Sequence, residues 1–180
     1  LTEAHGHVVE EFIDAAIDRG LEVYFQVSGQ SAPGMRDEDR PLLPGGGAPR
    51  RMADTGCLAS PAIRSYLRAY VADLVARYPK ITGFRPDWPE YPCYMLDEGF
   101  QDFSPHVRRW ALERGVPFDD LQSEVAALYE ALHGGLRNDD LAAFAGGDRG
   151  AGEGLTLLRR FCGVFDWLRL KSALSVNMLR

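Results

Sequence analysis

Two stretches of this chain repeat one order of elements: a short apolar strand, a long loop, and a helix that opens on Ser-Pro. The expected strands are residues 21–27 and 81–87, and the helices start at 60–61 and 104–105, with serine as N-cap and proline in the first turn. The first strand is apolar on both faces, which is typical of a buried parallel strand. The repeat therefore predicts parallel strands joined by helices.

The loops are long on one side of these units only. Residues 28–59 and 88–103 follow the strands, whereas Gly20 and residues 79–80 are the short links from a helix to the next strand. In parallel α/β proteins the carboxyl ends of the strands carry the site, and the loops there grow with function. We expect functional residues in the two long loops; idle insertions are the alternative.

The remainder of the chain is predicted to be helical, with glycine-rich residues 145–154 as a loop. A length of 180 residues fits one domain over 1–180. The chain opens on Leu1 without a signal peptide and stops inside a helical pattern, so we expect a fragment of a larger barrel. The expected helices are 8–17, 61–78, 105–115, 119–133, 138–144 and about 155–180.

Charge and cysteine content narrow the function classes. The net charge of −6 disfavours nucleic-acid and anionic-membrane partners, which need a basic face, and no apolar run is long enough to span a membrane. Cys57, Cys93 and Cys162 are widely spaced, which indicates neither a disulfide framework nor a zinc site and slightly favours the cytoplasm. We expect no cofactor and no metal; the oligomeric state is left open.

Polar residues gather at the end of the second expected strand. Strand alternation puts Arg85 and Asp87 on one face, and Gln26 lies on the corresponding face of the first strand. Two opposite charges on a buried face are expected to pair, because an isolated buried charge is costly. Such a pair would hold Asp87 ionised, which suits a nucleophile or a stabiliser of positive charge. A structural ion pair is the alternative interpretation.

The following loop combines aromatic rings with carboxylates. Trp88, Glu90 and Tyr91 come first, and Tyr94, Asp97 and Glu98 follow. Aromatic rings stack on the CH faces of sugars and carboxylates bind their hydroxyls, so this composition indicates carbohydrate recognition. Glycoside hydrolysis needs two carboxyl groups around the scissile bond. Asp87 and Glu90 are the candidate pair, and Trp88, Tyr91 and Gln26 are the candidate substrate contacts.

These segments resemble a bacterial family of uncharacterised, glycoside-hydrolase-like TIM-barrel proteins. The most specific piece is 83–92, Gly-Phe-Arg-Pro-Asp-Trp-Pro-Glu-Tyr-Pro; its first five residues are distantly similar to the fourth-strand motif of the α-amylase superfamily. That similarity implies Asp87 as nucleophile and Arg85 as the residue that orients it. The resemblance extends over these segments: 20–34, 40–79, 81–108, 127–136 and 165–180.

The expected fold class is therefore α/β, a partial TIM (β/α)8-type barrel with parallel strands and a helix-rich C-terminal part. The expected function is glycoside hydrolysis of a poly- or oligosaccharide by Asp87, Glu90 and Arg85. Pro86 is unusual in a central strand, and a full barrel takes about 250 residues. Both features favour a non-catalytic carbohydrate-binding or degenerate relative as the alternative. A weaker alternative is a metal-dependent sugar isomerase or aldolase using Asp87, Glu90 and His106.

Overall fold

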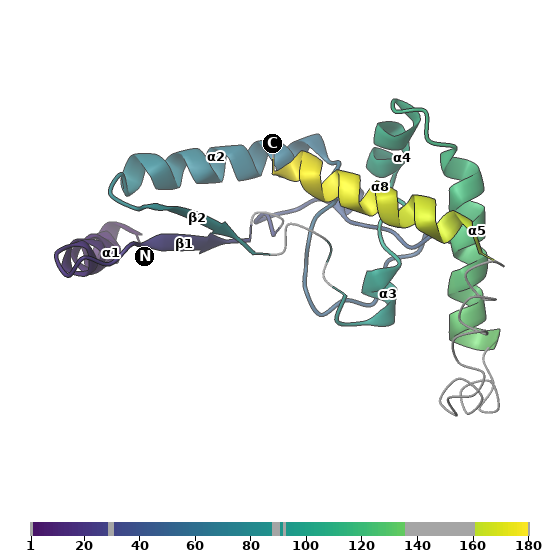
Figure 1. The fold of residues 1–180 in the computed structure, drawn as a ribbon, viewed down its shortest axis with the longest axis horizontal. Helices are drawn as coiled ribbons and strands as arrows, with labels where there is room; N and C mark the ends of the chain where they lie inside the picture. Colours follow the sequence, from purple (N-terminus) through teal and green to yellow (C-terminus); the bar gives the residue numbers. More distant parts are fainter. Residues whose placement is uncertain (1, 29–30, 88–90, 92, 136–160, 180) are drawn as a thin grey trace.

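The computed structural model describes residues 2–28, 31–87, 91, 93–135 and 161–179. Helices dominate them, and the order of elements follows the chain (Figure 1). The elements are α1 Thr2–Ile17, β1 Tyr24–Val27, the 3-10 helix η1 Asp37–Asp39, α2 Pro61–Arg77, β2 Gly83–Pro86, α3 Leu96–Gly99, α4 Pro105–Leu112, α5 Phe118–Glu130, the π-helix η2 Ala131–Gly135 and α8 Gly163–Met178.

The fold class expected from the sequence is wrong in its main point, because the described residues contain no partial TIM barrel. They form one sheet of two short strands, β1 and β2, and the remaining regular elements are helices. The strands are parallel, as predicted, and pair in register from Tyr24 opposite Gly83 to Val27 opposite Pro86. The local signals for the strands and the helix between them are thus correct. The step from one such unit to a barrel came from the resemblance to TIM-barrel proteins, and the two-stranded sheet contradicts it.

The sheet belongs to a small N-terminal layer with α1 and α2. Its core is Ile13 of α1, Val23 beside β1 and Tyr78 at the end of α2, and the Tyr78 ring meets Phe25 edge-on at 5.2 Å. Gly20 has φ +75° and ends α1: its amide donates to the Ile17 carbonyl, and the next amide donates to the carbonyl of residue 16. This glycine turn directs the chain straight into β1, as the sequence predicted.

The larger core lies between α4, α5 and α8 and includes part of the first long loop. Phe103, Phe118 and Trp167 pack there with ring centroids 5.7 to 6.4 Å apart. In Figure 1, α8 runs from beside the middle of α5, where the Gly163 amide donates to the Glu124 carboxylate, back toward the start of α2. There the Arg64 guanidinium donates to the Asn177 carbonyl at 3.3 Å. α8 therefore connects the helical core to the N-terminal layer.

Both Ser-Pro helix starts are confirmed. The Ser60 hydroxyl accepts the amides of Ala62 and Ile63, and the Ser104 hydroxyl accepts the amide of Val107. Each serine thereby satisfies backbone donors that the first turn of a helix leaves unpaired. The expected helix over 138–144 and the glycine-rich loop over 145–154 lie outside the described residues.

Candidate functional site at the strand ends

Asp87 and Gln26 meet where the two parallel strands end. The Asp87 amide donates to the Val27 carbonyl at 2.8 Å, which continues the strand pairing by one residue. The Gln26 Nε2 donates to Asp87 Oδ2 at 2.8 Å, joining residues that are far apart in the sequence. The parallel register explains this contact, because it sets Gln26 opposite Arg85 and leaves Asp87 just beyond it. The structure thus brings two of the predicted site residues together.

Arg85 does not make the expected contact with Asp87. Both side chains are described, and no ion pair joins them. Arg85 is exposed on a sheet face that no described element covers, so its charge stays hydrated and needs no buried partner. The pairing was predicted on the assumption of a buried strand, and the two-stranded sheet removes that assumption. Gln26 is the residue that positions the Asp87 carboxylate.

Ser28 adds a second polar group at this edge. Its hydroxyl is buried and has no hydrogen-bond partner among the described residues. Buried polar atoms are normally paired, so an orphaned hydroxyl is a group that can serve a ligand or a bound water. Ser28 directly follows β1 and lies two residues after Gln26 in the chain. The contact that the structure shows at this site is therefore between Gln26 and Asp87, with Ser28 next to it in the chain.

The other predicted site residues are placed differently. Trp88 and Glu90 lie outside the described residues. Tyr91 is buried, and its hydroxyl donates to Asp102 Oδ2 and accepts the Leu58 amide, each at 2.9 Å. Burial and the nearby Asp102 charge raise the pKa of Tyr91 well above its usual value. With both hydrogen-bonding roles used and the ring packed in the core, Tyr91 holds the two long loops together.

Glu98, expected in a sugar-binding loop, points inward and binds backbone. It is fully buried, and its carboxylate accepts the amides of Met52, Ala53 and Met95 at 2.8 to 3.2 Å. Burial alone would raise the pKa of Glu98, but these amide donors outweigh it and hold the pKa below its usual range. The Glu98 carboxylate therefore anchors the first long loop.

Asp97 anchors the same loop a little further along. One carboxylate oxygen accepts the Arg50 amide at 2.9 Å, and the other accepts the Tyr129 hydroxyl and faces His133 Nε2 at 2.8 Å. Burial opposes ionisation, but the Arg50 amide and the partners on the helix bring the pKa of Asp97 below its usual range. The interaction connects the loop to the end of α5 and to η2.

Asp102 forms a third buried cluster that sequence reasoning missed. Its Oδ1 accepts the amides of Leu42 and Ser104, and its Oδ2 accepts the hydroxyls of Tyr91 and Ser104. The thiol of Cys57 lies 3.2 Å from the Ser104 hydroxyl. Burial raises the pKa of Asp102 despite these donors. The sequence signal was the spacing of Asp102 two residues before a Ser-Pro helix start, where a carboxylate can bind the N-cap amide.

Lys171, one of only two lysines in the chain, was also missed. Its ammonium donates to the Gly99 carbonyl at 2.7 Å and lies 4.9 Å from the centroid of the Trp167 ring. Burial lowers the pKa of Lys171 to about 8, although the charges of Cys93 and Asp102 oppose this. The Lys171 side chain therefore packs against the core through these contacts. Burial makes its charged form less favourable than that of an exposed lysine.

The described residues contain no group of three or more His, Cys, Asp or Glu side chains placed to hold a metal ion. His106, part of the metal-dependent alternative, has its Nε2 3.4 Å from Asp39 Oδ1, so it faces the Asp39 and Ser60 cluster. Within the same residues, no helix has the length and apolarity needed to cross a membrane. Comparison of the sequence and structure with protein-family models, curated proteins and solved structures gave no match.

Proposed function

We propose that the protein is a glycoside hydrolase that acts on a poly- or oligosaccharide, with Asp87 as nucleophile or stabilising carboxylate. The observation that supports this most is the 2.8 Å hydrogen bond from Gln26 to Asp87 at the carboxyl ends of two parallel strands. Strand ends of this kind are where α/β proteins place their reacting groups. The resemblance of residues 83–92 to glycoside-hydrolase-like proteins leads to the same residue.

The hydrogen bonding of Asp87 suits this role. The Gln26 amide binds Oδ2, and Oδ1 accepts no hydrogen bond from the described residues. One oxygen fixes the orientation of the carboxylate, and the other is left to approach an anomeric carbon. The hydrogen bond from the neutral Gln26 amide is weaker than the charge-assisted bond predicted from the Arg85 guanidinium, so it neutralises less of the negative charge on Asp87. Asp87 is oriented and still keeps its nucleophilic character.

The second carboxyl group is proposed to be Glu90. Three carboxylates of the following segment, Asp97, Glu98 and Asp102, are buried and saturated with donors from the protein, so none is available to protonate a leaving group. Glu90 lies three residues after Asp87 and ahead of all three in the chain. Trp88 is proposed as the ring that stacks on the sugar.

The test is hydrolysis of a panel of oligosaccharides by the protein and by Asp87→Asn. We expect a loss of at least about 100-fold in kcat/KM, because loss of the carboxylate removes covalent or electrostatic assistance. Gln26→Ala should lower kcat by about tenfold with little change in KM, because it loosens only the orientation. Asp73→Asn, an exposed aspartate of α2, is the matched control. If Asp87→Asn hydrolyses the panel like the protein itself, the proposal is wrong.

A carbohydrate-binding protein without hydrolytic activity is the second candidate. The exposed Arg85, which pairs with no carboxylate among the described residues, and Pro86 inside β2 favour it, because both depart from the arrangement that the resemblance implies. This candidate predicts a rise in Tm with one class of oligosaccharide and no turnover. Trp88→Ala should then abolish the rise, and Asp87→Asn should leave it unchanged.

A further inference from the structure

The two lysines of the chain, Lys80 and Lys171, have opposite surroundings. Lys80 is exposed, and its ammonium donates to Asp14 Oδ1 at 2.6 Å, which raises the pKa of Lys80. Lys171 is half-buried, and it pairs with no carboxylate in the part of the chain that the structure describes. Lysines that leave the solvent are normally paired. Lys171 therefore departs from the usual arrangement, and Lys80 is its matched reference.

The described residues offer the Lys171 ammonium one hydrogen-bond acceptor for its three hydrogens. It donates to the Gly99 carbonyl at 2.7 Å, and it lies 4.9 Å from the centroid of the Trp167 ring and 5.9 Å from that of the Tyr91 ring. Burial, the main cause, lowers the pKa of Lys171 to about 8, so about a quarter of its amine is neutral at pH 7.5. A desolvated lysine of this kind is a nucleophile.

The tryptophan beside this amine carries a donor without an acceptor. Trp167 is buried, and its Nε1 has no hydrogen-bond partner among the described residues. A buried indole N–H normally has a partner, so this one can serve a group that the chain itself does not supply. Trp167 lies four residues before Lys171 in α8, which puts both side chains on one face of the helix. An amine with too few acceptors therefore lies beside a donor with none.

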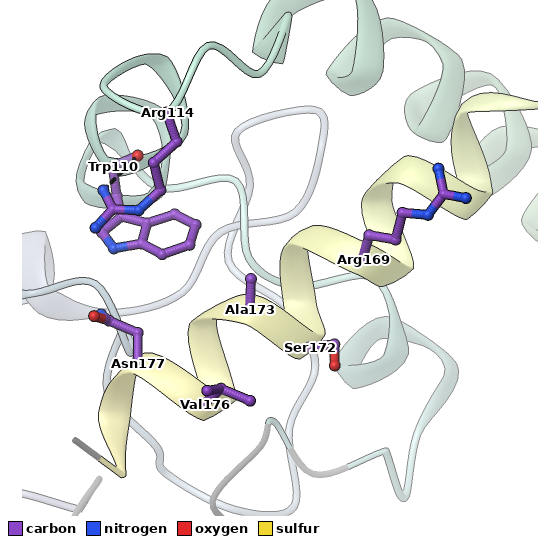
Figure 2. Close-up of a pocket in the computed structure, with 7 residues that line it drawn as sticks. All are labelled: Trp110, Arg114, Arg169, Ser172, Ala173, Val176 and Asn177. Carbon is purple, nitrogen blue, oxygen red and sulfur yellow. Dashed lines mark hydrogen bonds between the residues drawn. The ribbon is translucent and has the colours of Figure 1, made fainter.

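The other described cation of α8 has a different environment. Arg169 and Ser172 border a hollow of about 470 Å³ between α4 and α8, and Lys171 is not part of its lining (Figure 2). Arg169 pairs with Asp166 at 2.8 Å, so its charge has a carboxylate partner. Within the described part of α8, the cation without such a partner is Lys171.

N-acylation of Lys171 would supply the partners that both groups lack. An acylated lysine has one N–H, which matches the single acceptor at Gly99, and one carbonyl oxygen, which is the kind of acceptor that Trp167 Nε1 lacks. It also carries no charge, so burial no longer penalises it. A Schiff base formed with an aldehyde would add no oxygen at this position, and a carbamate would add a negative charge. The hydrogen-bonding groups therefore favour an acyl group.

We propose that Lys171 is an acylation site that accepts a short acyl group, such as acetyl, from an acyl thioester or an acyl phosphate. The amine lone pair attacks the carbonyl carbon, the C–N bond forms, and the C–S or C–O bond to the leaving group breaks. The thiolate or phosphate leaves with the electron pair, and the nitrogen releases one proton to solvent. The Trp167 N–H donates to the carbonyl oxygen as negative charge develops on it. The site is separate from Asp87 and does not depend on the proposed hydrolysis.

Competition between the two lysines tests the proposal. The protein is treated at pH 7.5 with the acetyl thioester of N-acetylcysteamine or with acetyl phosphate, and peptide mass spectrometry gives the initial acetylation rate at each lysine. With at least one donor, Lys171 should react at least about tenfold faster than Lys80. Its neutral fraction is about 200-fold larger, and its burial and lower basicity offset only part of this.

The dependence on pH and on the acetyl donor completes this experiment. The advantage of Lys171 should shrink as the pH rises toward 10, because Lys80 then loses its proton as well. The donor that gives the larger preference identifies the source of the acyl group. A smaller ratio with both donors, or a ratio that does not change with pH, would overturn the proposal.

Matched tryptophan variants test the indole donor. Trp167→Phe keeps an aromatic ring and removes Nε1, so it should slow acetylation of Lys171 at least about fivefold and leave Lys80 unchanged. Trp110→Phe removes an indole donor from α4 and should leave both rates unchanged. An unchanged Lys171 rate in Trp167→Phe would contradict the proposed site.

A further measurement leaves the core sequence intact. In Lys80→Arg, which keeps a cation beside Asp14, Lys171 is the one remaining lysine that can be acetylated. Its acetylation should raise the Tm at pH 7, because burial penalises the ammonium and not the amide. The double variant Lys80→Arg with Lys171→Arg, treated in the same way, should keep its Tm. A Tm that does not rise on acetylation of Lys171 would show that the amide does not fit beside Trp167 and would refute the proposal.

Discussion

The carboxylates that the structure describes between residues 87 and 102 divide into two kinds. Asp87, at the end of β2, accepts one hydrogen bond from a side chain and remains partly exposed. Glu98, eleven residues later, is fully buried and accepts three backbone amides. The two residue types differ by one methylene, so the difference comes from the surroundings. A carboxylate with filled acceptor sites maintains structure, whereas one with an open oxygen remains available for chemistry.

This contrast also explains the first long loop. Residues 40–58 contain little regular structure, yet Leu42, Arg50 and Met52 each donate a backbone amide to a buried carboxylate. Those bonds replace the hydrogen bonds that a helix or sheet would supply. Residues 40–58 are therefore neither an idle insertion nor part of the proposed functional site. Hydrogen bonds hold them against the segment that precedes α4.

The largest effect is expected at Asp102. Asp102→Ala removes the acceptor of two buried amides and two hydroxyls, and we expect it to lower the free energy of unfolding by about 3–5 kcal/mol. Asp102→Asn keeps an oxygen for the two amides, so its cost should be about 1–2 kcal/mol. Urea unfolding followed by circular dichroism measures both. If the Ala and Asn variants are equally stable, the hydrogen bonds do not hold the loop.

The pH dependence of stability sharpens the comparison at Glu98. Its pKa is lowered in the folded protein, so the stabilisation from its charge is complete above about pH 5 and is lost as the pH falls through the folded-state pKa. Glu98→Gln should therefore be about 1–3 kcal/mol less stable than the protein at pH 7, with a smaller difference at pH 3.

The control for that experiment is Glu130→Gln, an exposed residue of α5. Its stability should follow that of the protein at both pH values. Asp102 works in the opposite direction, because its raised pKa makes the folded state favour the protonated form as the pH falls. A difference between Glu98→Gln and the protein that is constant from pH 7 to pH 3 would contradict the charged anchor.

The sequence predicted the local elements well for identifiable reasons. Ser60, Ser104 and Gly20 mark helix ends through hydrogen bonds between residues at most five positions apart. Such local patterns can be recognised in the sequence without knowledge of the tertiary structure. The barrel was implied by the resemblance to TIM-barrel proteins, whereas the residues themselves indicated only a strand–helix–strand unit, which does not require a barrel. The local bond from Asp102 to the Ser104 amide had a sequence signal, but the long-range anchoring did not. The amides of Leu42, Arg50 and Met52 lie about 45 to 60 residues from the carboxylates that they bind, and every residue except proline has such an amide. The sequence also could not distinguish Gln26 from Arg85 as the partner of Asp87, since that choice depends on strand register and on exposure of the sheet.

The smallest effect on stability is expected at Asp87, where the effect on function should be largest. Asp87→Asn keeps an oxygen that can accept the Gln26 amide, and the site is not buried deeply, so the free energy of unfolding should change by no more than about 0.5 kcal/mol. The same Asp-to-Asn substitution at Asp102 is the internal comparison. If Asp87→Asn destabilises the protein as much as Asp102→Asn does, then Asp87 is a structural anchor like Glu98, and the distinction between open and filled carboxylates fails. An unchanged Tm together with lost hydrolysis would instead show that Asp87 is retained for chemistry, since the fold does not require its charge.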